Sequence, residues 1–232
     1  MIEVKDLHKK FGKNEVLKGI DLNIERGGIF SVLGPNGSGK TTLIKCILGM
    51  VLPDSGAISV DGKPLKNNFK YRNEIDYLPQ IANFPGNLKV NELIAMIKDL
   101  RDSKATKDEE LIELFKLQPF LNNLSGGTKQ KVNLVLTFMF DSPLIILDEP
   151  TSGLDPISHL RLKNLIFSER EKGKTILVTS HILSFVEEIA DEIVFLLEGK
   201  IYFKGTITEL KTKTEQPDFE HAIASILSSS YA

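Results

Sequence analysis

The N-terminal part of the chain alternates apolar and polar residues. Residues 2–4 and 16–24 have a period of two, which is typical of strands that bury only one face. The turn at residues 53–56 is followed by a hairpin-like segment over residues 57–63, and residues 75–78 form a further short strand pattern. Short apolar runs bounded by turn residues predict strands buried on both faces. These runs are residues 29–33, 144–147 and 175–179.

Helical patterns occupy most of the remaining sequence. Residues 40–49 have helical character and end at a glycine, and residues 91–117 carry apolar positions at helical spacing. Residues 132–140 predict a buried helix, and residues 159–172 predict a helix between two buried strands. The charged segment 101–110 is interpreted as a solvated connection between helices rather than a binding patch. Strands that alternate with helices predict an α/β fold with a mostly parallel central sheet.

Composition narrows the class of protein. The chain has 232 residues, of which 41% are hydrophobic and 26% charged, with a net charge of -2. This balance gives no electrostatic reason to expect a nucleic-acid partner. The apolar stretch 132–140 is far shorter than the roughly 20 residues that cross a bilayer, and the N-terminus is charged, so we expect a cytoplasmic protein. Cys46 is the only cysteine and is interpreted as a core residue.

A glycine-rich loop follows the first buried strand. Residues 34–41 read GPNGSGKT and match the pattern G-x-x-x-x-G-K-[ST], between a predicted strand and a predicted helix. Glycines let successive backbone N–H groups point at phosphate oxygens, and the helix adds its positive end. Lys40 would neutralise the β- and γ-phosphates, and the Thr41 hydroxyl would ligate Mg²⁺. A chance glycine-rich turn is the alternative. The other predicted contacts to the nucleotide here are Asn36, Gly37, Ser38, Gly39 and Thr42.

Two carboxylates end a buried strand further along the chain. Asp148 follows the apolar run 144–147 directly and would hold Mg²⁺, either directly or through water. Glu149 comes next, where a general base could polarise an attacking water. Taken alone, an ordinary acidic turn would explain the pair equally well. The phosphate-binding loop favours the catalytic interpretation.

A second candidate anion-binding segment precedes this strand. Residues 124–130 read LSGGTKQ, which places a hydroxyl and two glycines at the start of a helix. Ser125 is also expected to cap that helix, a common structural role. Capping does not explain why two glycines follow.

The segment 124–130 resembles the signature motif of the ATP-binding cassette (ABC) ATPases, and the other motifs of that family occur in order between residues 2 and 205. The resemblance implies a P-loop ATPase core with an N-terminal antiparallel β subdomain and an inserted helical subdomain. It implies that Phe11 stacks on adenine, that Gln80 acts at the metal and in catalysis, and that His181 contacts the γ-phosphate. Residues 152–155 match the loop that couples two sites, with Asp155 at the nucleotide. His8, His159 and His221 are interpreted as structural.

The resemblance also implies partners. Two copies pair head to tail in this family, so Ser125 and Gly127 of one copy would face the ATP bound to Lys40 of the other. An integral membrane permease would be contacted near residues 81–91, at the inner face of the cell membrane. The implied division of the chain is an ATP-binding core over 1–80 and 138–210, a helical subdomain over 81–137 and a C-terminal helical tail over 211–232.

The spacing between the motifs indicates the branch of the family, because it excludes the insertions and second cassette of other branches. About forty residues separate Gln80 from Ser125, too few for a long coiled-coil insertion, and the chain has one phosphate loop. The ending 218–223 resembles exporters whose permease is a separate chain. Residues 77–80, 83–88 and 125–132 more narrowly resemble the ATPase of the transporter that matures the copper site of nitrous oxide reductase, with a generic exporter as the alternative.

Two other functions stay open on the sequence. One is an ABC ATPase that serves a machine other than a transporter, and the other is a nucleotide switch that does not hydrolyse. Lys40, Asp148, Glu149 and His181 are all present, which disfavours the switch. Leu136 stands where many relatives carry an arginine, so a coupling role at that position is in doubt.

Overall fold

Two sheets form the frame of the molecule in the computed structural model, which describes residues 1–65, 68–81, 83–85, 87–101, 107–118 and 125–230. Leu124 of the signature segment and residues 82 and 86 of the predicted permease contact lie outside the described residues. An antiparallel sheet has the order β2-β1-β4-β5. Its strands are β1 (Ile2–Phe11), β2 (Asn14–Ile24), β4 (Ser55–Val60) and β5 (Lys63–Pro64).

The second sheet has the order β10-β9-β3-β8-β7-β6 and is parallel except for the edge strand β10. Its strands are β3 (Gly28–Leu33), β6 (Ile75–Leu78), β7 (Leu144–Asp148), β8 (Thr175–Ser180), β9 (Glu192–Leu197) and β10 (Lys200–Gly205). The central strands β3, β7 and β8 are buried almost throughout, because helices and the other sheet cover both of their faces. The predicted α/β fold with a mostly parallel sheet is confirmed.

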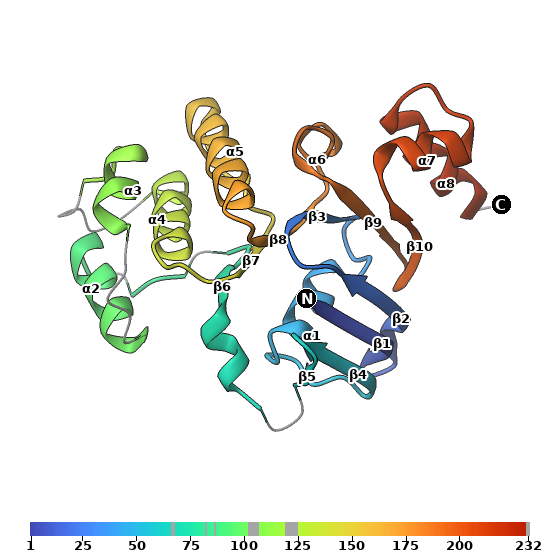
Figure 1. The fold of residues 1–232 in the computed structure, drawn as a ribbon, viewed down its shortest axis with the longest axis horizontal. Helices are drawn as coiled ribbons and strands as arrows, with labels where there is room; N and C mark the ends of the chain where they lie inside the picture. The colour runs from blue at the N-terminus through green and yellow to red at the C-terminus, as the bar shows by residue number, and fades with distance from the viewer. Residues whose placement is uncertain (66–67, 82, 86, 102–106, 119–124, 231–232) are drawn as a thin grey trace.

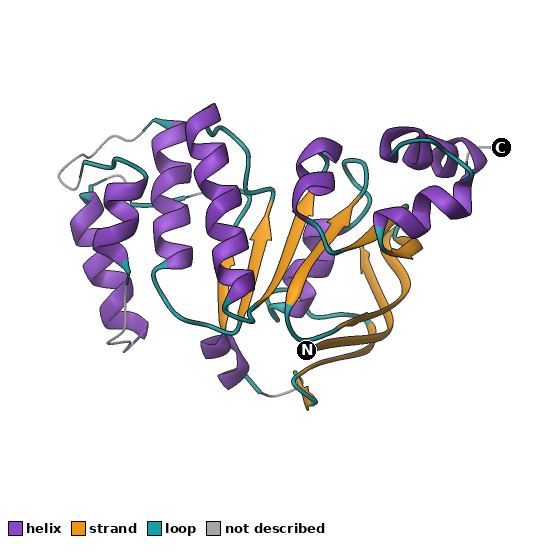
Figure 2. Cartoon of the chain, turned by 45° about the horizontal axis from the view of Figure 1, so that its top comes forward, coloured by secondary structure: helices purple, strands orange, loops and turns teal. Residues whose placement is uncertain are grey.

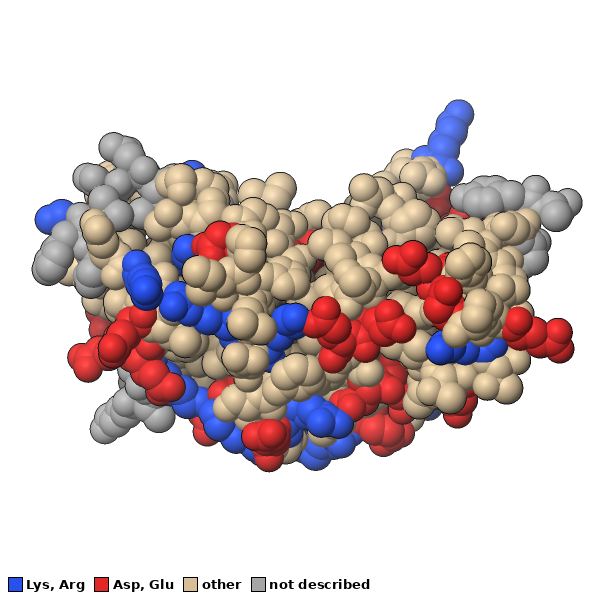
Figure 3. All heavy atoms as spheres, turned by 90° about the horizontal axis from the view of Figure 1, so that it is seen from above, with Lys and Arg blue, Asp and Glu red and all other residues tan. Residues whose placement is uncertain are grey.

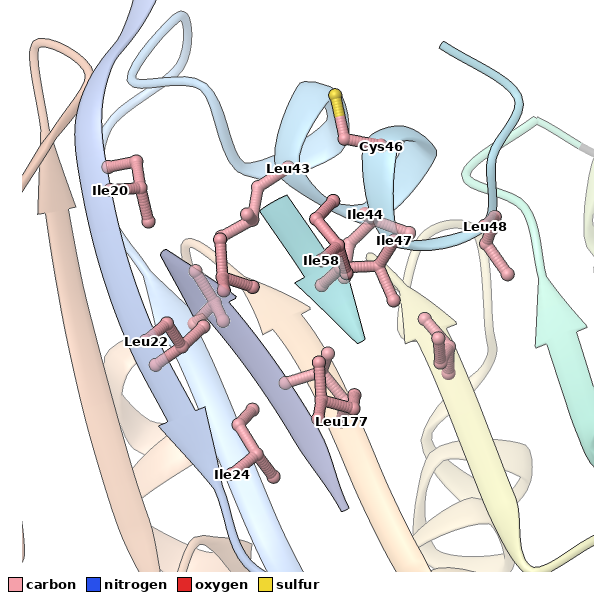
Figure 4. Packing of buried hydrophobic residues seen from close by; sticks show 14 of the residues in the cluster. Ile20, Leu22, Ile24, Leu43, Ile44, Cys46, Ile47, Leu48, Ile58 and Leu177 are labelled. Atoms are coloured by element: carbon pink, nitrogen blue, oxygen red, sulfur yellow. The ribbon is translucent and has the colours of Figure 1, made fainter. Parts of the chain in front are cut away.

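Helix α1 (Lys40–Ile47) packs between the two sheets. Figure 4 shows Leu43, Ile44 and Ile47 among strand residues that include Leu22 and Leu177. The predicted core role of Cys46 is confirmed, since this residue is buried in the same cluster. Burial raises the pKa of the Cys46 thiol to about 11, so the side chain stays neutral at physiological pH.

The remaining helices form two groups with α6 (Leu183–Ile189) between them (Figures 1 and 2), and α6 contributes residues to the cores of both groups. One group packs around the side of the parallel sheet that carries β6, β7 and β8: α2 (Val90–Arg101), α3 (Asp108–Leu114), α4 (Gly126–Phe138) and α5 (Pro156–Glu171). At the other end, α7 (Ile207–Thr214) and α8 (Phe219–Ser230) form a smaller core with β9 and β10. A 3-10 turn, η1 (Lys70–Glu74), leads into β6.

Two boundaries of the predicted three-part division can be located on the helices of the structure. The boundary at 137/138 lies at the last turn of α4, and the boundary at 210/211 lies within α7. Helices α7 and α8 pack against each other and against β9 and β10. The three-part division stays a prediction. Among the described residues, no helix is long and apolar enough to cross a membrane.

The interpretation of segment 101–110 as a solvated connection is wrong at its first residue, and residues 102–106 lie outside the described residues. Arg101 ends α2 and forms an ion pair with Asp76 on β6, whose side chain is fully buried. The guanidinium also donates to Ser142 Oγ at 2.6 Å and lies over the Phe140 ring. Burial raises the pKa of Asp76, and Arg101 opposes that rise. The sequence did not reveal this contact, because Asp76 is 25 residues away and the neighbouring charges favoured a solvated segment.

We expect Arg101→Met to lower the free energy of unfolding by about 3 kcal/mol, because it leaves the Asp76 carboxylate buried without its cation. Methionine keeps the apolar stem and its packing on Phe140. Lys98→Met is the matched control, since Lys98 lies on the same helix and its ion pair with Asp108 is more exposed. Urea unfolding of both variants measures the difference. Equal losses in the two variants would contradict a buried role for Arg101.

Candidate active site

The phosphate-binding loop connects β3 to α1, as predicted. Gly34 leaves no room for a side chain, because a Cβ there would lie 2.0 Å from the carbonyl oxygen of Leu196. Gly39 precedes α1 with a φ of 109°, a left-handed conformation that favours glycine. Asn36 and Gly37 are exposed at the tip of the loop, and Thr42 is half-buried in the first turn of α1. The local backbone of the motif therefore requires glycine for steric reasons alone.

Lys40 lies inside the loop that precedes it. Its Nζ donates to the carbonyl oxygens of Gly34 at 2.7 Å and of Pro35 at 3.2 Å. Burial lowers the pKa of Lys40, and the nearby Glu149 and Asp148 carboxylates oppose that shift. Ser38 Oγ is buried and has no hydrogen-bond partner in the described part of the chain. A buried ammonium and an unpartnered hydroxyl in one loop suit a phosphate ligand.

Asp148 and Thr41 supply the oxygen atoms of the predicted metal site. Asp148 is fully buried at the end of β7, and its Oδ1 accepts a hydrogen bond from Thr41 Oγ1 at 3.3 Å. Its Oδ2 is buried and accepts no hydrogen bond from any described residue. Hard oxygen donors of this kind suit Mg²⁺, which is commonly held by one or two carboxylates together with phosphate oxygens. The residues therefore fit a magnesium–nucleotide complex.

Glu149 and His181 meet above the ends of β7 and β8. The Nδ1 atom of His181 lies 2.8 Å from Oε2 of Glu149, and Lys40 Nζ lies 3.8 Å from Oε1. Glu149 is only 3% exposed, whereas the His181 side chain is half-exposed. Parallel strands present their carboxyl ends at one edge of a sheet, and this edge brings the residues after β3, β7 and β8 together. The sequence did not predict the direct contact between Glu149 and His181.

Thr179 is the residue of this site that the sequence analysis missed. It is fully buried near the end of β8, and its hydroxyl contacts Asp148 and the backbone of Glu149. A threonine inside an apolar strand has the ordinary interpretation of a β-branched core residue. Its position two residues before His181 is the only signal in the sequence that points to the site.

Two other residues with predicted roles, Phe11 and Gln80, are not among the hydrogen-bond partners of the carboxylates in the described part of the chain. Phe11 ends β1 and is 51% exposed, so its ring does not pack in the core. One face of its ring carries Lys9 Nζ, 5.3 Å from the centroid. Gln80 is exposed two residues after β6, and no hydrogen bond to another described residue joins it to Thr41 or Asp148. Among the described residues, Gln80 is therefore not hydrogen-bonded to the residues of the predicted metal site.

The signature segment begins α4, and Ser125 caps it as expected. Ser125 Oγ accepts a hydrogen bond from the Thr128 amide at 3.3 Å. Gly127 is close-packed, because a Cβ there would lie 2.8 Å from the carbonyl oxygen of Gly153. No contact between described residues joins Ser125 or Gly127 to the phosphate-binding loop. Two different surfaces of the chain thus carry anion-binding features.

The loop after Glu149 packs against the signature helix. Gln130 Nε2 donates to the Pro150 carbonyl at 3.0 Å, and Lys131 Nζ lies 2.6 Å from Asp155 Oδ2. Asp155 caps α5 by accepting from the Ser158 amide at 2.9 Å. The Lys131 ammonium and the bonds from Ser158 hold the pKa of Asp155 well below its usual range. Within one chain, the partners of the Asp155 carboxylate are therefore Lys131 and Ser158.

Charged side chains of both signs are interspersed over the face of the molecule drawn in Figure 3.

The three histidines interpreted as structural contact residues outside the phosphate-binding loop and the carboxylates. His8 is within hydrogen-bond distance of Asp6 and Glu15, His159 packs on the Phe185 ring, and His221 lies against Asp218.

Comparisons with known proteins agree with this geometry. Residues 17–152 match the family model described as ABC transporter. The L-cystine import ATP-binding protein TcyN of Bacillus subtilis is 31% identical over 93% of this chain and 90% of its own length. A solved ATP-binding subunit of an ABC transporter is 30% identical with a TM-score of 0.90, covering 98% of this chain and 99% of its own. A bacterial ABC transporter cassette solved as a dimer is 25% identical with a TM-score of 0.81, covering 89% of this chain and 98% of its own.

The chain belongs to the ABC transporter family. It is an ATP-binding subunit with the fold of an ABC cassette, and it is an ATPase whose ligands are ATP and Mg²⁺. Similar cassettes form dimers.

Proposed function

We propose that two copies of this chain bind two ATP molecules head to tail, hydrolyse them at composite sites and thereby drive an integral membrane permease. The observation that carries the proposal is the separation of two half-sites. Lys40, Asp148 and Glu149 gather at one sheet edge, whereas Ser125 and Gly127 lie on the exposed start of α4. A second copy can bring its own α4 to that edge, which completes the site.

Each residue at the sheet edge has a role that its contacts support. Mg²⁺, when bound with ATP, supplies charge neutralisation at the β- and γ-phosphates. Thr41 and the Asp148 carboxylate, whose Oδ2 has no partner among the described residues, would hold it, and Lys40 would bind the same phosphates. Glu149 accepts a proton from the attacking water, and His181 holds the Glu149 carboxylate through Nδ1 while its exposed edge is available to the γ-phosphate. Phe11 offers an exposed ring face for adenine.

The other half-site and the loop roles follow the same scheme. Ser125 Oγ and the backbone of Gly127 bind the γ-phosphate of the ATP held by the other copy. Asp155 lies on the loop between Glu149 and α5, so movement of α4 reaches the loop through Lys131 and Gln130. Gln80 is exposed just after β6, at the same edge of the sheet as Asp148, and would join the metal site from there. The exporter branch and the copper-maturation subtype stay predictions from the sequence.

Residues 81–91 carry the proposed permease contact, at the inner face of the cell membrane. Ile81 at the start of this segment is 77% exposed, so its apolar side chain is accessible to a partner. This segment directly follows β6 and Gln80, so a movement of the permease would be transmitted to Gln80.

Cross-linking tests the permease contact. Cys46 is buried, so Ile81→Cys adds a single accessible thiol to the chain. In the complex that co-purifies from membranes, we expect Ile81→Cys to cross-link to the integral membrane subunit. Tyr202→Cys, which is exposed on β10 at another end of the molecule, should not. Cross-linking from Tyr202→Cys alone in an intact complex would place the permease elsewhere.

A further inference from the structure

Thr179 lies between the two strands that supply the chemistry of the site. Strand β8 pairs with β3, which leads into the phosphate-binding loop, and with β7, which ends in the carboxylates. In this register Thr179 lies beside Asp148 on one side and Val32 on the other. The side chain is fully buried, so each of its polar contacts forms away from water.

The hydroxyl of Thr179 contacts both carboxylate residues at once. Its Oγ1 donates to Asp148 Oδ1 at 2.5 Å and accepts from the backbone N–H of Glu149 at 3.0 Å. The carbonyl oxygen of Thr179 accepts from the same N–H at 3.2 Å. A hydroxyl can donate one hydrogen bond and accept others, which is what this position requires. Valine has nearly the same shape and can do neither.

The first contact fixes the orientation of the Asp148 carboxylate. Thr179 and Thr41 both lie against Oδ1, whereas Oδ2 has no partner among the described residues. A charge-assisted bond to one oxygen prevents rotation about the side chain and leaves the other oxygen available to a cation. Without the Thr179 hydroxyl, either oxygen could turn toward Thr41.

The second contact stabilises an uncommon backbone conformation. Glu149 has a φ of 50°, a left-handed value that few residues other than glycine adopt. Both bonds from its N–H end on Thr179, so Thr179 holds the conformation that directs the Glu149 carboxylate to His181. Backbone strain of this kind persists where the surrounding contacts determine it.

We infer that Thr179 is a positioning residue for the ATPase reaction, which sets the Asp148 oxygen presented to Mg²⁺ and the backbone of Glu149. This inference rests on the proposed roles of Asp148 and Glu149. Thr179 acts through these two residues and does not contact the nucleotide itself. The alternative is that its hydroxyl merely satisfies the buried groups around it and contributes only to stability.

Thr179→Val and Thr179→Ser separate the two interpretations. The measured quantity is the Mg²⁺ concentration that gives half of the thermal stabilisation by ATP, together with steady-state turnover. Loss of a hydrogen bond to a charged group lowers an equilibrium constant roughly tenfold or more. We expect Thr179→Val to raise the Mg²⁺ midpoint and to lower turnover by about tenfold each. Thr179→Ser keeps the hydroxyl and should stay within about twofold of the original chain in both measurements.

Thr175→Val is the matched control. Thr175 begins the same strand, is equally buried, and its hydroxyl accepts from the Gly27 amide at 2.8 Å, away from the carboxylates. Thr175→Val should lose thermal stability, as Thr179→Val does, but its Mg²⁺ midpoint should equal that of the original chain. If Thr179→Val matches Thr175→Val in every measurement, Thr179 has no positioning role. If Thr179→Val does not fold, Thr179→Ala removes the same hydroxyl from a smaller side chain: a raised Mg²⁺ midpoint in folded Thr179→Ala supports the inference, and an unshifted one overturns it.

Asp148→Asn distinguishes failure of this inference from failure of the proposed function. An unchanged Mg²⁺ midpoint in Asp148→Asn would mean that Asp148 does not hold the metal, and the proposed site would then be wrong. A shifted midpoint in Asp148→Asn with an unshifted one in Thr179→Val would reject only the role of Thr179.

Discussion

Glu149→Gln should reduce ATP hydrolysis by roughly 10²–10⁴-fold, as expected for the loss of a general base. Glutamine keeps the size of the side chain and a contact to His181 Nδ1, but it cannot accept the proton of the attacking water. Mg-ATP binding should persist, because Lys40, Thr41 and Asp148 are untouched. ATP that is bound and not cleaved remains between the two copies, so the dimer should also be more stable.

Turnover and sedimentation in the presence of Mg-ATP measure the two effects. Glu198→Gln is a suitable control, because Glu198 is also a non-glycine residue at positive φ but lies exposed after β9. It should hydrolyse ATP like the original chain. Near-original turnover in Glu149→Gln would remove Glu149 from the reaction and leave the mechanism without its base.

Mixing two inactive variants should restore activity if each site is shared between copies. Lys40→Ala removes the phosphate-binding ammonium from one half-site, and Ser125→Arg blocks the other with a bulky side chain. In either homodimer both sites carry one defect. In the heterodimer one site carries both defects and the other is intact, so ATP hydrolysis should reappear only in the mixture.

The proportions of the mixture provide the control. Activity should rise to a maximum near equal amounts and should stay absent when Lys40→Ala is mixed with a Lys40→Ala, Ser125→Arg double variant. Heterodimers isolated with two different affinity tags remove the uncertainty about exchange between copies. Tagged heterodimers that bind Mg-ATP but stay inactive would contradict the proposal that each ATP site is shared between the two copies.

Much of the fold was readable because its signals are local. The apolar runs that became β3, β7 and β8 are contiguous, and so is the motif that became the loop before α1. The signature segment was found in the same way, including the Ser125 cap. Motifs of this kind are recognisable because neighbouring residues fix each other's backbone geometry.

Contacts between distant segments could not be read in this way. Arg101 and Asp76 are 25 residues apart, and the charge-rich sequence around Arg101 favoured the wrong prediction of a solvated connection. Thr179 and Asp148 are 31 residues apart, and a threonine in an apolar strand carries no mark of its partner. In both cases the partner is decided by which strands or helices pack together.

The sequence by itself determined what this protein binds, because residues 34–41 form a complete phosphate-binding loop over eight neighbouring positions. The tertiary structure decided how the reacting groups meet. Parallel pairing of β7 with β8 places Asp148 beside Thr179 and brings Glu149 to His181, since parallel strands end at the same sheet edge. The same packing keeps Ser125 away from that edge, at the start of α4.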